Sequence, residues 1–215
     1  MRHRSSFALF LLLAGLSGFL YADDAPVRPV ADLEARLEGV RSLEAAFEQV
    51  TTDKDGRAVQ QSEGHLWVQT PSLFRIETST PFVQTLVSDG KSFWAYDQDI
   101  DQVVIRNLDE DVEQVPILLL GGASQRIEDE YDVSHFADED IEHFVLVPKS
   151  PSSLFESLTL DFTGARPVGL SISDSLGQRT HITLKDVVTN VKIDDARFGF
   201  EAPQGVDVID DRIDQ

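Results

Sequence analysis

The stretch that decides the fold covers residues 64–96 and reads GHLWVQTPSLFRIETSTPFVQTLVSDGKSFWAY. Pro71 and Pro81 interrupt it, because a proline cannot donate a backbone hydrogen bond within a sheet. The pair Asp89-Gly90 predicts a tight hairpin turn of type I′, which requires a positive φ at both central residues. We therefore expect about three or four short antiparallel strands in this stretch. The hairpin strands are expected over residues 84–88 and 91–96.

The same stretch is rich in aromatic side chains, namely Trp67, Phe74, Phe82, Phe93, Trp94 and Tyr96. Large aromatic side chains on short strands either fill a core or line an apolar pocket. The residues by themselves leave both alternatives open.

The N-terminus has the pattern of a secretory leader. Arg2 and Arg4 precede an apolar run over residues 7–20, and Ala22 precedes two aspartates. We expect a signal peptide over residues 1–22 and a single domain over residues 23–215. The alternative, a membrane anchor, is disfavoured because the apolar run has 14 residues, and a spanning helix needs about 20.

Composition narrows the function further. The chain has no cysteine, which excludes disulfides, thiol catalysis and the lipidated cysteine of a bacterial lipoprotein. Its net charge is −20, and loss of Arg2 and Arg4 with the leader makes the mature chain −22. Such a chain repels phosphate backbones, so nucleic acid is not an expected partner. An acidic surface is also an adaptation to salt, an alternative that the residues leave open.

The remaining chain alternates between strand and helix patterns. Leu33 and Leu37 lie on one face of an amphipathic helix over residues 30–40, and Pro116 begins a short apolar helix that Gly121 ends. Residues 124–140 are expected to be irregular with a short helix or strand. In total we expect about ten or eleven short antiparallel strands in a curled sheet, with the helices covering its dry face. The other expected strands cover residues 42–52, 58–69, 102–106, 143–147, 157–162, 167–174, 179–185 and 205–209.

No motif for catalysis stands out. The chain lacks a Gly-x-Ser-x-Gly elbow, a His-Glu-x-x-His helix and a phosphate-binding loop. His65, His143 and His181 each lie in an expected strand, on a face that we expect to be solvated. Asp53-Lys-Asp55-Gly begins like a calcium loop but lacks the distal glutamate. We therefore expect no enzyme and no cofactor; a hydrolase with an unrecognised site is the alternative.

Several short motifs, in this order and spacing, resemble the LolA family, the periplasmic outer-membrane lipoprotein carriers of Gram-negative bacteria. No single motif is specific, but together they extend over residues 30–209. The motifs are Gly64-x-Leu-Trp-Val68, Pro71-x-Leu-Phe-Arg75, Leu86-Val-Ser-Asp-Gly-Lys-x-x-Trp-x-Tyr96, Gln102-Val103, Pro116-Ile-Leu-Leu119, Phe144-x-Leu-x-Pro148 and Phe198-x-Phe-x-x-Pro-x-Gly-Val206.

The resemblance implies a mainly β fold, an incomplete, open antiparallel β-barrel with an α-helical lid over an apolar cavity. It also implies a soluble, monomeric periplasmic chaperone. Such a carrier accepts acylated lipoproteins from an inner-membrane LolCDE-type ABC transporter and delivers them to an outer-membrane LolB-type receptor. That receptor is itself a lipoprotein, so the absence of cysteine favours the carrier. The alternative is a periplasmic sensor or regulator module with a similar half-barrel that binds lipid or peptide.

The resemblance also suggests site residues. A lid latch, an arginine in the family, falls on Thr70, and Arg75 is the candidate to replace it. For each lipid-binding candidate, ordinary core packing is the alternative. The candidates that would line the cavity or form the lid are Phe74, Trp67, Phe82, Leu86, Trp94, Ile117, Leu118, Leu119, Leu120, Leu33 and Leu37.

Overall fold

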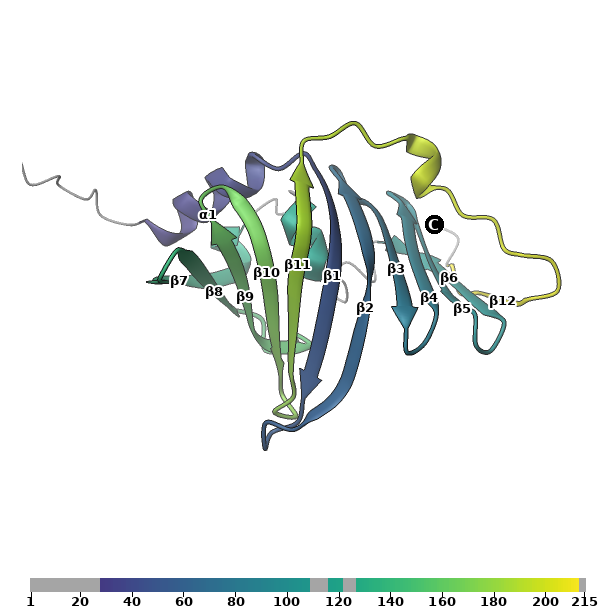
Figure 1. The fold of residues 1–215 in the computed structure, drawn as a ribbon, viewed down its shortest axis with the longest axis horizontal. Helices are drawn as coiled ribbons and strands as arrows, with labels where there is room; N and C mark the ends of the chain where they lie inside the picture. Colours follow the sequence, from purple (N-terminus) through teal and green to yellow (C-terminus); the bar gives the residue numbers. More distant parts are fainter. Residues whose placement is uncertain (1–27, 109–115, 122–126, 213–215) are drawn as a thin grey trace, which may run out of the picture.

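The structure is a computed structural model, and it describes residues 28–108, 116–121 and 127–212. These residues form one twelve-stranded sheet that curls around two helical pieces (Figure 1). The helical pieces are the α-helix α1 (Pro29–Glu38) and the 3₁₀ helix η2 (Pro116–Gly121), with the single-turn α3 (Ile127–Glu130) leading into the sheet. The strands are β1 (Ser42–Thr52), β2 (Ala58–Gln69), β3 (Leu73–Thr80), β4 (Gln84–Asp89), β5 (Ser92–Asp97), β6 (Gln102–Asn107), β7 (Tyr131–Asp138), β8 (Ile141–Pro148), β9 (Phe155–Thr163), β10 (Arg166–Asp174), β11 (Arg179–Thr189) and β12 (Asp207–Asp210).

The sheet is open, as expected for an incomplete barrel. Its order is β12-β6-β5-β4-β3-β2-β1-β11-β10-β9-β8-β7, so β12 and β7 are two unjoined edges. The short helix or strand expected within residues 124–140 is present as α3 and the edge strand β7. One expectation was wrong, because β12 pairs with β6 in parallel rather than antiparallel. The direction of a strand pair is set by the tertiary fold, which composition alone does not reveal.

Buried apolar side chains recur at every second position along the strands, so they gather on one face of the curled sheet. This apolar face is the concave one, and the side chains between them point to the convex face. Leu158, Leu160 and Phe162 alternate along β9 and are fully buried on the concave side. Leu33 and Leu37 of α1 are buried in the same core, which confirms the amphipathic helix. The lid piece η2 contacts α1, β1 and β2. The two helical pieces therefore cover the concave face, as Figure 1 shows.

The hairpin at Asp89-Gly90 lies where it was expected, but its turn is not of type I′. Gly90 has a φ of +87°, whereas Asp89 is not among the residues with positive φ. The Asp89 carboxylate instead accepts hydrogen bonds from the backbone N–H groups of Lys91 and Ser92, at 2.9 and 2.8 Å. The aspartate thus builds the turn with its side chain, an arrangement in which Asp89 itself needs no positive φ.

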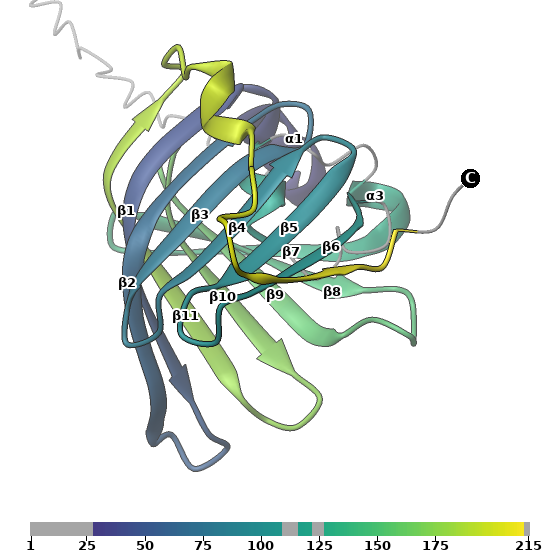
Figure 2. The ribbon, with the colours of Figure 1, turned by 90° about the vertical axis from the view of Figure 1, so that its right-hand side faces the viewer.

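The C-terminal segment runs across the convex face (Figure 2). After β11 the chain forms the 3₁₀ helix η3 (Asp195–Phe198), which contacts β3 and β4, and then reaches the edge as β12. Ile193 and Phe198 bury Trp67 of β2, and the Arg197 guanidinium lies 4.3 Å from the centre of the Trp67 ring system. This segment forms a second, smaller apolar cluster on the outside of the sheet.

Gly64 lies on β2 beside a bulge in the β2–β3 pairing, where the backbones of the two strands come very close together. A Cβ at this position would lie 2.0 Å from the carbonyl oxygen of Glu77 and 2.8 Å from the Phe47 ring. The backbone would have to move to admit any side chain. Phe47 can therefore extend over β2 toward the cavity only because residue 64 is a glycine.

We expect Gly64→Ala to lower the free energy of unfolding by about 1–3 kcal/mol, because the added methyl group overpacks the core. Gly199→Ala is the matched control, since its Cβ would lie at an ordinary 3.6 Å from the nearest atom and its φ of −85° suits alanine. Urea unfolding of both variants measures the difference. Equal stabilities would contradict the close approach.

Candidate functional site

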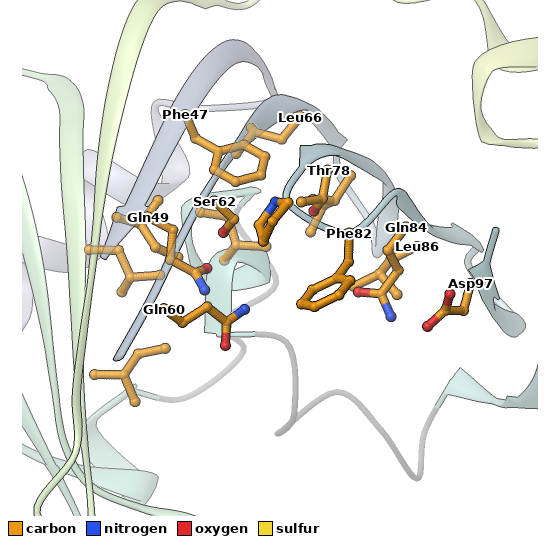
Figure 3. Close-up of a pocket in the computed structure, with 16 residues that line it drawn as sticks. Phe47, Gln49, Gln60, Ser62, Leu66, Thr78, Phe82, Gln84, Leu86 and Asp97 are labelled. Atoms are coloured by element: carbon orange, nitrogen blue, oxygen red, sulfur yellow. The ribbon is translucent and has the colours of Figure 1, made fainter. Parts of the chain in front are cut away.

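A cavity of about 410 Å³ lies on the concave face between the two halves of the sheet. Its buried end is formed by Phe47 of β1, Leu66 of β2 and Ile117 of η2. Leu170 and Ile172 of β10 contribute from the opposite side. Figure 3 shows Phe47 and Leu66 at one end of the cavity and Gln60 and Asp97 toward the other. The curl of the sheet thus brings strands far apart in sequence around one space.

The lining changes in chemistry from the buried end to the exposed end. Aliphatic and aromatic side chains line the interior, whereas Gln49, Gln60, Ser62 and Gln84 gather toward the opening. Among the described lining residues Asp97 is the only ionisable side chain. A wall of this kind suits an extended hydrocarbon chain with a polar, uncharged group at its outer end.

Three of the candidate residues line the cavity, namely Phe82, Leu86 and Ile117. Phe82 lies at the opening, where most of its side chain is exposed. Leu120 of the lid is fully buried and Leu119 packs against the core, whereas the side chain of Leu118 lies outside the described residues. The lid is a 3₁₀ helix rather than the expected α-helix. Contact of these residues with lipid stays a prediction.

Phe74 occupies the core rather than the mouth of the cavity. Its exposed fraction is 0%, and its ring lies 6.0 Å from that of Phe93. Leu33 and Leu37 are buried in the same cluster. None of the three is among the cavity-lining residues, so ordinary core packing, the alternative noted from the sequence, describes them in this structure.

Placing Trp67 and Trp94 in the cavity was wrong. Trp67 belongs to the convex cluster with Ile193 and Phe198. Trp94 lies beside Phe200, with ring centroids 6.4 Å apart. Each tryptophan follows a concave-facing neighbour by one residue, and successive strand residues point to opposite faces.

Among the described residues, the hydrogen bonds of both proposed latch residues lead to segments other than η2. The Thr70 hydroxyl donates to the carbonyl of Arg41 at 3.3 Å, in the connection between α1 and β1. Arg75 points to the convex face, where its guanidinium donates to the carbonyls of Arg197 and Gly199 at 3.4 and 3.5 Å and pairs with Glu77. Arg75 thus fastens the C-terminal segment instead of the lid.

Arg36 fastens the covering helix α1 to the sheet, and the sequence did not single this residue out. It forms an ion pair with Glu142 of β8 and donates to the Gly164 carbonyl at 3.1 Å. Its guanidinium also lies 4.9 Å from the centre of the Phe144 ring, a cation–π contact. Arg36 and Glu142 are far apart in sequence, so no local pattern of residues indicates that they form a salt bridge.

We expect Arg36→Met to lower the free energy of unfolding by about 1.5–3 kcal/mol, because hydrogen bonds to a half-buried charged group are lost. Glu142→Gln should cost less once Arg36 is already replaced, and a double-mutant cycle by urea unfolding measures that coupling. Arg28→Met serves as a control because Arg28 is exposed at the start of the helix. Additive losses would show that Arg36 acts independently of Glu142.

His143 does not lie on a solvated face as expected. Its Nδ1 lies 2.6 Å from the carboxylate of Asp161, a side chain that is almost fully buried on the convex face. Phe136 stacks on the imidazole at a centroid distance of 4.5 Å. His65 and His181 are exposed, as expected.

At the far edge of the sheet, hydrogen bonds from the Arg212 side chain lower the pKa of Asp210.

Comparisons with known proteins address the whole fold. A model of the family described as "Outer membrane lipoprotein carrier protein LolA" matches residues 38–201, from the end of α1 to the segment after η3. The chain belongs to the LolA family. Among its relatives, the outer-membrane lipoprotein carrier protein of Chromohalobacter salexigens is 45% identical over 82% of this chain and 84% of that protein. The carrier of Azotobacter vinelandii is 36% identical over 93% and 96%.

A solved structure shares the fold of this chain. An uncharacterised conserved protein from Thermus thermophilus superposes with a TM-score of 0.51, covering 84% of this chain and 98% of its own. At 14% identity this likeness concerns the fold alone. Among the helices of the described residues, none is both long and apolar enough to cross a bilayer.

Proposed function

We propose that the protein is a periplasmic chaperone that carries triacylated lipoproteins from the inner to the outer membrane. The observation that carries the proposal is the cavity beneath η2, with an apolar interior and an uncharged polar approach except for Asp97. The curated relatives named as lipoprotein carriers support it. In this role the chain binds and shields its cargo and performs no chemical step.

A lipoprotein needs a carrier because exposing its acyl chains to water is unfavourable. Each methylene group of an acyl chain gains about 0.8 kcal/mol when it leaves water, so a lipoprotein has little tendency to leave a membrane unaided. A carrier must cover the acyl chains and yet release them. The described part of the lid, η2, is suited to this because it is a short 3₁₀ segment packed through the buried side chains of Ile117 and Leu120, and short helices owe their stability to packing.

Export and partners complete the proposal. Residues 1–22, which lie outside the described residues, would direct the chain to the periplasm and be removed there. An inner-membrane LolCDE-type transporter would load the cavity, and an outer-membrane LolB-type receptor would empty it. Transfer in that direction requires the receptor to bind the cargo more tightly than the carrier does.

The test is a release assay with the mature protein. Inner-membrane vesicles containing the cognate transporter and a radiolabelled lipoprotein are mixed with the carrier and ATP. We expect labelled lipoprotein in the supernatant as a one-to-one complex with the carrier. Absence of release with a folded carrier and an active transporter would refute the carrier role and favour a sensor or regulator that binds another lipid or peptide.

A further inference from the structure

The cavity on the concave face has a closed inner end. On β1 its lining ends at Phe47, on β2 at Leu66 and on β3 at Ile76. On each of these strands the next residue of the concave face toward α1 is buried and does not line the cavity. These three residues are Ala45, Val68 and Phe74, with exposed fractions of 2%, 1% and 0%. In the described structure, packed core therefore begins where the cavity ends.

Phe47 supplies the largest side chain of this inner wall. The strand register places Gly64 directly opposite Phe47, and a Cβ at residue 64 would lie 2.8 Å from the Cε1 atom of the Phe47 ring. The ring therefore lies against the backbone of β2. Figure 3 shows it at the end of the cavity away from Asp97, beside Leu66. An acyl chain that enters past Asp97 would meet the Phe47 ring at the inner end.

The inner wall is built mainly on strands, so most of it does not depend on the position of the lid. Phe47 and Leu66 belong to β1 and β2, which pair along their whole length, whereas Ile117 belongs to η2. A lid that moves to admit cargo carries Ile117 with it and leaves the two strand residues in place. Because protein interiors are close-packed, a methylene group that reaches the Phe47 ring has no further apolar space to enter.

We propose that Phe47 sets the length of acyl chain that the cavity shields completely. A chain that ends before the ring buries each added methylene group, and each one strengthens binding by about fourfold. Once the chain reaches the ring, a further methylene group stays in water or has to displace packed core, so it strengthens binding no more. The inference deepens the proposed function and rests on it, because it names acyl chain length as a property by which the carrier selects its cargo.

The test measures the binding of single acyl chains to the mature protein, without a transporter. The probes are 1-monoacylglycerols of increasing saturated chain length, used below their critical micelle concentrations, because their uncharged glycerol ester suits the polar opening. Displacement of the neutral dye N-phenyl-1-naphthylamine reports their affinity. We expect the affinity to rise about fourfold with each methylene group and then to level off. The chain length at which it levels off is called the limit.

Phe47→Leu should move the limit to longer chains by about one or two methylene groups and Phe47→Ala by about three or four, because part of the removed ring volume becomes open to the chain. The leucine variant keeps a large apolar side chain, so it tests the proposal even if the alanine variant does not fold. Phe74→Leu is the matched control, since Phe74 is buried in the same core cluster but does not line the cavity. Its limit should equal that of the native chain, even if its stability is lower.

Several outcomes would overturn the proposal. They are an unchanged limit in Phe47→Leu, an equal shift in Phe74→Leu, and an affinity of the native chain that does not level off with chain length. Failure of the native chain to bind any of the monoacylglycerols would overturn it as well.

The release assay separates this inference from the carrier function. A native chain that binds monoacylglycerols up to a limit set by Phe47 but releases no lipoprotein would refute the carrier role and leave Phe47 as the inner wall of a lipid-binding pocket. Release of lipoprotein by the native chain, together with an unchanged limit in Phe47→Leu, would refute the role of Phe47 and leave the carrier role standing.

Discussion

Leu86→Glu is expected to abolish lipoprotein acceptance while the chain stays folded. Leu86 lines the cavity on β4 and is only partly buried, so in the empty protein the new carboxylate can reach water. When acyl chains fill the cavity, the carboxylate must lose that water without gaining a partner, which costs several kcal/mol. At about 1.4 kcal/mol for each tenfold change in affinity, acceptance should fall by more than about 100-fold. The amount of labelled lipoprotein released per folded carrier measures the effect.

Val147→Glu is the matched control for that variant. Val147 is an exposed residue of β8, and the substitution adds the same charge away from the cavity. Its release activity should equal that of the native chain. Normal acceptance by a folded Leu86→Glu variant would show that the acyl chains do not occupy this cavity.

Phe74→Ala is expected to lower the free energy of unfolding by about 3–5 kcal/mol. Phe74 is fully buried, and truncation of a buried phenylalanine removes its apolar contacts and leaves a cavity. A loss of that size is a large fraction of the roughly 5–15 kcal/mol that stabilises a typical domain. Phe74→Glu should prevent folding altogether, because it buries an unpaired charge. The first variant is measured by urea unfolding and the second by circular dichroism of the purified chain.

Phe82→Ala provides the comparison within the same residue type. Phe82 is mostly exposed at the cavity opening, so its truncation should change stability by no more than about 0.5 kcal/mol. Similar losses in the two alanine variants would contradict the placement of Phe74 in the core. The pair therefore separates a residue that holds the fold together from one that is free to meet cargo.

Local patterns in the sequence predicted most of the elements. Leu158, Leu160 and Phe162 alternate with polar neighbours, and this alternation correctly indicated one dry face of β9. Leu33 and Leu37 recur at helical spacing, and α1 lies where that spacing placed it. The run after Pro116 was too apolar to stand in water, and it covers the core as expected. The order of the motifs pointed to the LolA family, which the relatives bear out.

Strand period, helix period and turn residues act over a few neighbours, so the residues alone indicate most of the strands and helices. Which aromatic side chains reach the cavity depends instead on how the sheet curls and on what covers each of its faces. Trp67 and Trp94 satisfy the same motifs as the concave residues beside them, but the C-terminal segment covers the opposite face of the sheet with Phe198 and Phe200. The tertiary structure also decided that Arg36 rather than Thr70 or Arg75 fastens a covering helix. Such contacts join residues distant in sequence, and the curl of the sheet sets them, so no local pattern could reveal them.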